Sequence, residues 1–147
     1  MANPQFQRLE QAVLAMPMAR TLGLRFNRIE RGQVEVELPI AEAFTFTPGQ
    51  LQATPIFAAA DFAAVSAAGS LLPEGWRNAT VDATMKLVAP AVGRLVRARG
   101  RVVSAGKLLT VCAAEVYAVD ANGEETLCAT LLGTARNIRP PVPAEAG

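Results

Sequence analysis

The fold is decided by the stretch TPIFAAADFAAVSAA at residues 54–68. Placed on a helix, this stretch is apolar on all sides except at Asp61 and Ser66. A helix that is apolar all round is buried on all sides. Thr54 is a good N-cap, and Pro55 is of a type favoured at the first helical position. The sequence therefore predicts a buried central helix that begins at Pro55 and ends before Pro73.

The segments before this helix are predicted from apolar spacing and from turn residues. They are an amphipathic helix over residues 6–14 closed by Pro17, a helical turn ending at Gly23, a hairpin over residues 25–38 that turns at Arg31-Gly32, and a loop over residues 41–52.

Four long segments after the central helix are predicted to be strands. They are residues 78–88, 94–104, 108–119 and 125–138, with a hairpin turn at 120–123 between the last two. Alternation in the first of them places Thr80 on the face opposite to Val81, Ala83 and Met85. The order of elements predicts an α+β fold, in which an antiparallel sheet packs against the helix.

Composition excludes several classes of function. The chain has 147 residues and a net charge of +1, from 14 Lys and Arg against 13 Asp and Glu, which gives no field for nucleic acid or an anionic membrane. It has no histidine, which excludes Ser-His-Asp and Cys-His catalysis, His-ligated zinc and any His base. Cys112 and Cys128 are too few for a disulfide framework or a four-ligand metal site, so we expect no metal and two reduced, buried thiols.

No targeting signal is recognised at the N-terminus, which lacks the basic and apolar regions of a signal peptide. The longest apolar run, residues 55–72, is mostly alanine and contains Asp61, so it does not indicate a membrane span. We therefore expect a cytoplasmic protein with no membrane contact. Residues 1–139 are predicted to form a single domain, and residues 140–147 a loose Pro-rich tail.

Two stretches carry a resemblance to a known family. Residues 46–54, FTPGQLQAT, followed by Ala60-Asp61, correspond to Asn-x-x-Gly-x-x-His-Gly-Gly and a later Ala-Asp. In this stretch Gly49 and Asp61 match, whereas Phe46 stands for Asn, Gln52 for His, and Ala53 and Thr54 for the two Gly. The second stretch matches at Thr80, Val81, Leu87, Val88, Pro90, Ala91 and Gly93, with Ala89 where Arg or Lys is usual. Gly106-Lys107 and Gly133-Thr134 also match.

The chain thus resembles the hotdog-fold acyl-CoA thioesterases of the phenylacetate-pathway, or PaaI-like, branch, over roughly residues 22–138. This resemblance implies a curved antiparallel sheet wrapped around a long buried central helix. It also implies hydrolysis of an acyl-CoA thioester to a free acid and coenzyme A, without a further cofactor. The family assembles as homodimers paired edge to edge, or as tetramers made of two such dimers, with each site built from both subunits.

Carried over position by position, the resemblance assigns roles to individual residues. Asp61 is the base or nucleophile, the backbone N–H of Ala53 at the start of the central helix is the oxyanion donor, and Gln52 orients the substrate. The remaining residues that we expect to bind substrate are Phe46, Gly49, Thr54, Phe57, Ser66, Ala89 and Pro90.

The residues themselves leave alternatives open. A carboxylate among Ala and Phe side chains should have a raised pKa unless it is paired, but Asp61 can also face solvent or cap a loop. Gln52 can be a loop residue facing water, and Ser66 can line the cleft or bond back to its helix. Arg97, Arg99 and Arg101 share one sheet face, which is either solvated or in contact with the phosphates of coenzyme A.

The altered motif also suits a hotdog protein that binds acyl-CoA or a similar ligand without hydrolysing it, whereas a hydratase is disfavoured by the absence of histidine.

Overall fold

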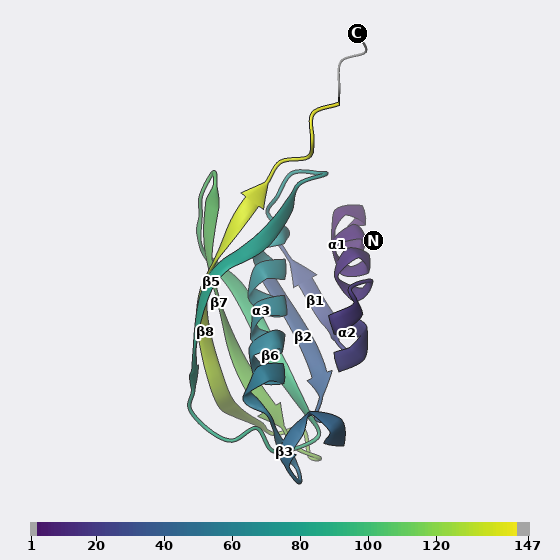
Figure 1. Ribbon diagram of the computed structural model, residues 1–147, viewed down its shortest axis with the longest axis vertical. Helices are drawn as coiled ribbons and strands as arrows, with labels where there is room; N and C mark the ends of the chain where they lie inside the picture. Colours follow the sequence, from purple (N-terminus) through teal and green to yellow (C-terminus); the bar gives the residue numbers. More distant parts are fainter. Residues whose placement is uncertain (1–2, 144–147) are drawn as a thin grey trace.

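Six antiparallel strands form one curved sheet that wraps around helix α3 (Ala53–Gly69), as Figure 1 shows. The computed structural model describes residues 3–143. The strand order is β1–β2–β6–β7–β8–β5, so that β5, which follows α3 in the chain, lies at one edge. The strands are β1 (Arg25–Glu30), β2 (Gln33–Pro39), β5 (Arg77–Leu87), β6 (Leu95–Ala105), β7 (Leu109–Val119) and β8 (Glu125–Ile138). The predicted α+β architecture, with a central helix inside a wrapped sheet, is confirmed.

Two helices precede the sheet, as predicted. They are α1 (Pro4–Leu14), whose N-cap Asn3 accepts a hydrogen bond from the Gln5 backbone N–H, and α2 (Pro17–Leu22). Gly23 ends α2 with φ of 74°, a conformation that glycine adopts without strain. In Figure 1 both helices lie on the same side of β1.

The packing of α3 against the sheet depends on small residues. The helix buries a series of alanines, namely Ala59, Ala60, Ala63, Ala64, Ala67 and Ala68. The closest approach is at Gly100 of β6, where an added Cβ would lie 2.1 Å from the carbonyl oxygen of Ala63. The backbone of the helix therefore rests directly on the backbone of the sheet at this point.

The start of α3 differs from the prediction. The helix begins at Ala53, its N-cap is Gln52 and no side chain caps it, so that Thr54 is inside the first turn and is not the N-cap. The first amides of any helix have no acceptor within the helix, and a proline is tolerated there because it lacks an N–H. Pro55 therefore marked the first turn of the helix but not its first residue.

The expected loop before α3 contains short elements of its own. A 3₁₀ turn, η1 (Glu42–Phe44), leads into a small hairpin of β3 (Thr45–Thr47) and β4 (Gln50–Leu51). Gly49 turns this hairpin with φ of 78°. The hairpin has only two cross-strand partner pairs, which is too little for an alternating sequence pattern to reveal.

Cys112 and Cys128 are free and buried, as predicted, and burial raises the pKa of each thiol to about 11. Of the predicted loose tail, residues 140–143 form neither helix nor strand, and residues 144–147 lie outside the described residues. Within the described part of the chain, no helix combines the length and hydropathy needed to cross a membrane.

Candidate active site

Asp61 is the centre of the candidate site. It lies in the middle of α3, half-buried, and its Oδ1 accepts a 2.8 Å hydrogen bond from the hydroxyl of Thr80 on β5. Burial raises the pKa of the Asp61 carboxyl above its ordinary value, and the Thr80 hydroxyl offsets part of that rise. Among residues 3–143 no Lys or Arg forms an ion pair with Asp61. This carboxylate is therefore the type of group that can accept a proton or attack a carbonyl near neutral pH.

A β-bulge in β5 aims Thr80 at Asp61. The pairing with β8 shifts between Thr80, opposite Ala135, and Asp82, opposite Thr134, so that Val81 is an extra residue. Beyond the bulge, Ala83 and Met85 face the core. Because the extra residue changes the parity of the strand, Thr80 lies on the same face as these two residues. The prediction that Thr80 lies on the opposite face was therefore wrong.

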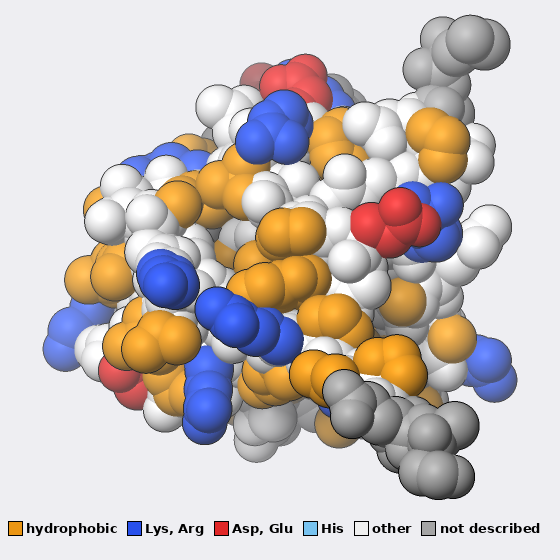
Figure 2. Space-filling model, turned by 90° about the horizontal axis from the view of Figure 1, so that it is seen from above, with side chains coloured by type: hydrophobic (Ala, Val, Ile, Leu, Met, Phe, Trp, Pro, Cys, Tyr) orange, Lys and Arg blue, Asp and Glu red, His pale blue; other side chains and the backbone are white. Residues whose placement is uncertain are grey.

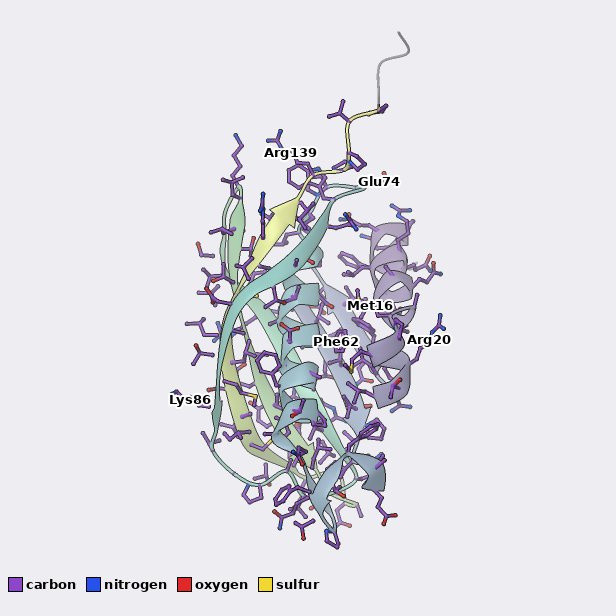
Figure 3. All side chains as sticks on the ribbon, viewed as in Figure 1. Met16, Arg20, Phe62, Glu74, Lys86 and Arg139 are labelled. Carbon is purple, nitrogen blue, oxygen red and sulfur yellow. The ribbon has the colours of Figure 1, made fainter. Side chains whose placement is uncertain are left out.

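A cavity of about 580 Å³ opens beside Asp61, between α2, η1 and α3. Its apolar lining includes Met18, Leu22, Phe44, Phe57 and Phe62. Figure 3 shows Phe62 projecting from α3 toward α2. Of the residues predicted from sequence, this cavity brings together Asp61, Gln52, Thr54 and Phe57.

A second cavity, of about 380 Å³, lies at the start of α3 between the β3–β4 hairpin and the loop after β5. It is lined by another group of the predicted residues, namely Phe46, Ala53, Ala89 and Pro90. Gly49, in the hairpin turn, and Ser66, which is buried in α3, line neither cavity. The predicted residues thus fall mainly into two groups, one around Asp61 and one around the Ala53 amide.

These two groups are too far apart to act on one carbonyl within a single chain. Ala53 and Asp61 are separated by eight residues of α3, which is roughly 12 Å of helical rise. A carbonyl carbon and its oxygen are separated by only about 1.2 Å. If both groups serve the same thioester, Asp61 and Ala53 must belong to different subunits.

The three arginines of β6 already have carboxylate partners. Arg97 contacts Glu37, Arg99 bonds to Glu35 and Glu125 at 2.8 Å each, and the Arg101 guanidinium is 3.4 Å from Glu115. Arg99 also stacks over the ring of Tyr117. This charge network favours the interpretation of a solvated outer sheet face over contact with coenzyme A.

Thr80 is the residue that sequence reasoning missed. It was present in the family-like stretch, but nothing in the residue pattern placed it beside Asp61, because the bulge reverses the alternation. As to metals, no three Cys, Asp or Glu side chains within residues 3–143 are grouped so as to hold an ion.

Comparison with solved structures relates this geometry to known proteins. A thioesterase family protein from Silicibacter pomeroyi is 32% identical, with a TM-score of 0.86 over 91% of this chain and 98% of that protein. This chain belongs to the thioesterase family. No profile of a known protein family matches the sequence, and no curated protein matches it.

More distant proteins have the same fold. A thioesterase from Haemophilus influenzae is 17% identical, with a TM-score of 0.81 over 98% of this chain and 97% of that protein. The PaaI protein of the phenylacetic acid degradation operon of E. coli is 19% identical, with a TM-score of 0.79 over 92% of this chain and 95% of that protein. Together with the 32% identical protein, this shared fold confirms the predicted membership of the hotdog thioesterase superfamily.

Proposed function

We propose that this thioesterase-family chain hydrolyses an acyl-CoA to a free acid and coenzyme A. The observation that carries the proposal is Asp61, a half-buried carboxylate on the wall of an apolar cavity, with no cationic partner in the part of the chain that the structure describes. A cavity of this size and lining suits a small apolar group. The raised pKa of the carboxyl suits proton transfer near neutral pH.

In the general-base form of the reaction, water attacks the thioester carbonyl while Asp61 takes the proton of that water. The carbon–sulfur bond then breaks, and Asp61 returns the proton to the departing sulfur. In the nucleophilic form, a carboxylate oxygen of Asp61 attacks the thioester carbonyl, the carbon–sulfur bond breaks, and coenzyme A leaves as a thiolate that takes a proton from solvent. Water then hydrolyses the mixed anhydride, which releases the acid and restores the Asp61 carboxylate. In both forms the Thr80 hydroxyl holds one carboxylate oxygen and leaves the other available to react.

The oxyanion is assigned to the start of α3. The Ala53 amide is the first of the helix and has no acceptor within it, and the positive end of the helix dipole favours developing negative charge there. Gln52 can donate a hydrogen bond to a carbonyl but cannot act as acid or base, so its role is to orient the substrate.

The function is tested by the release of free thiol from a panel of aliphatic and aromatic acyl-CoAs. We expect turnover, unchanged by a chelator because the mechanism uses no metal. The altered residues Gln52, Ala53 and Thr54 favour a second candidate, a protein that binds acyl-CoA without cleaving it. Saturable binding of acyl-CoA with no thiol released from any member of the panel would favour that second candidate.

The proposed active form is a homodimer, or a tetramer made of two dimers. Strand β5 is an unpaired edge that exposes Val81 and Leu87, and such edges are normally covered or paired. Antiparallel pairing of β5 with its copy lays the Leu87 end of one chain beside the Arg77 end of the other. This pairing would bring the Ala53 group of one subunit toward the Asp61 of its partner. Light scattering at micromolar concentration should therefore give at least a dimer, and a monomer would contradict the shared site.

Thr80→Val should move the acidic limb of the pH profile of kcat/KM to higher pH. In the parent chain the Thr80 hydroxyl lowers the pKa of Asp61. Its loss in Thr80→Val raises that pKa, so the carboxylate form is reached only at higher pH. The control is Thr84→Val, since Thr84 is an exposed residue on the opposite face of the same strand. An unmoved limb in Thr80→Val would show that Asp61 does not set the pH dependence.

A further inference from the structure

A third cavity, of about 480 Å³, lies where β8 ends and β5 begins. Its lining includes Trp76, Leu108, Arg136 and Arg139. The guanidinium carbon of Arg139 is 5.5 Å from the centre of the Trp76 ring, so that the two planar groups form one wall. Leu108 is two-thirds exposed and adds an apolar surface. Neither proposed catalytic group lines this cavity.

Among the described residues 3–143, the basic side chains around this cavity have no acidic partners. Arg77 pairs in the sheet with Ile138, which lines the cavity, and the side-chain amide of Asn137 donates to the carbonyls of Gly106 and Lys107. These two hydrogen bonds fix the turn carrying Lys107 to the end of β8. Within residues 3–143, none of Arg77, Lys107, Arg136 and Arg139 forms an ion pair. Figure 2, which views the molecule from this end, shows Lys and Arg side chains beside exposed hydrophobic ones.

This combination is specific in its chemistry. Unpaired guanidinium groups bind phosphate oxygens through charged, often bidentate, hydrogen bonds. An indole or guanidinium plane stacks on a base. Together they suit a ligand that carries both a flat purine and several phosphates. Glu74, the acidic residue nearest to Trp76 in sequence, forms an ion pair with Arg8 at 3.3 Å.

The cavity is also within reach of the candidate active site. Thr80, which bonds to Asp61, is three residues along β5 from Arg77, or roughly 10 Å at the rise of a strand. The extended pantetheine arm of coenzyme A can span such a distance. The position before Pro90, where the resembling family has Arg or Lys, is Ala89 in this chain and supplies no positive charge.

We propose that the cavity between Trp76, Arg136 and Arg139 binds the phosphorylated adenosine end of coenzyme A. The identity of this ligand rests on the proposed function. Arg136 and Arg139 bind phosphates, and the plane of Trp76 and Arg139 supports the adenine. The test is direct, because Trp76 is the only tryptophan of the chain and its fluorescence reports on this cavity alone.

Titration with coenzyme A or with adenosine 3′,5′-bisphosphate should quench the fluorescence of Trp76 to saturation, less so as salt is added. Arg136→Gln should raise the half-saturating concentration about tenfold, the effect of losing a charged hydrogen bond. Arg20→Gln, an exposed arginine of α2 that Figure 3 shows away from this cavity, should leave it unchanged. The proposal would be overturned if coenzyme A did not quench Trp76, or if Arg136→Gln bound it as tightly as the parent chain. Equal quenching by ATP and by inorganic phosphate would also overturn it, because the adenine would then contribute nothing.

A second readout separates binding from hydrolysis. Arg136→Gln should raise KM for acyl-CoA with little change in kcat, because the contact is made equally in the ground state and the transition state. It should leave hydrolysis of an N-acetylcysteamine thioester, which lacks the nucleotide, unchanged. Hydrolysis without quenching would overturn the nucleotide site alone, whereas quenching without hydrolysis of any thioester would overturn the proposed enzymatic function alone.

Discussion

Asp61→Asn should reduce thioester turnover by about 10²–10⁴-fold, the usual effect of losing a positioned acid–base group. Asparagine keeps the volume of the side chain and can still accept the bond from Thr80, but it cannot take a proton or attack effectively. Binding of the substrate should survive. The measurement is steady-state thiol release, with Glu124→Gln, an exposed carboxylate in the β7–β8 turn, as the control.

The turnover of Gln52→Ala and the folding of Asp61→Asn together identify the role of Asp61. Gln52→Ala should cost only about tenfold, since it removes at most one neutral hydrogen bond of about 0.5–1.5 kcal/mol. The ordering of the two variants is the test, and full activity in Asp61→Asn would make Asp61 a structural residue. Unfolding of Asp61→Asn would instead place Asp61 in a structural network.

The stability of Asp61→Asn should exceed that of the parent chain at neutral pH. Because the folded-state pKa of Asp61 is raised above its unfolded value, the parent chain loses stability as pH rises from the ordinary pKa through the raised one. Asparagine does not titrate, so the advantage of the variant should appear across that window and persist above it. Urea unfolding of both chains at acidic and neutral pH measures the difference.

Gly100→Ala should destabilise the fold by roughly 3 kcal/mol or more, at the upper end of the cost of overpacking. The added methyl would lie 2.1 Å from the Ala63 carbonyl oxygen, and this oxygen belongs to backbone that cannot rotate away. The helix α3 would have to move off the sheet, which would also disturb the Asp61–Thr80 contact. Both the denaturation midpoint and the turnover number should therefore fall.

Gly69→Ala is the matched control for this substitution. Gly69 is the last residue of α3, and a Cβ there would meet Leu9 at an ordinary 3.4 Å. Alanine is a better helix former than glycine by up to about 1 kcal/mol, so this variant should be neutral or more stable. Equal stability of Gly69→Ala and Gly100→Ala would show that the close approach at β6 does not limit the packing of α3.

The sequence was sufficient where one physical signal dominated. The alanine-rich run around Asp61 predicted the buried helix, and alternation with turn residues predicted the long strands, because burial on one face leaves a repeating pattern. The same logic failed at Thr80, since a bulge adds one residue without changing composition. It also failed at the start of α3, where Pro55 is compatible with several positions in the first turn.

The candidate site was predictable only in part for a related reason. Asp61 stood out as the one carboxylate in an apolar helix, and the family-like motif placed Ala53 and Gln52 nearby in sequence. Sequence distance did not reveal that Ala53 and Asp61 belong to two different cavities. That separation follows from the straightness of a helix, which places residues eight positions apart more than two turns away from each other.

The alanines of α3 have a consequence for how the cavity beside Asp61 can adapt to its contents. Alanine has no rotamers, so burying it costs no side-chain entropy, whereas each buried leucine costs about 0.5–1 kcal/mol. The alanine positions of α3 that pack on the sheet therefore have no alternative side-chain arrangement. Repacking around substrates of different shape must occur among the larger side chains that line the cavity, which include Phe62 of α3 and the unbranched, flexible Met18 of α2. Breadth of substrate is thus a property of these lining side chains, and the fixed position of the carboxylate is a property of the alanine positions of α3.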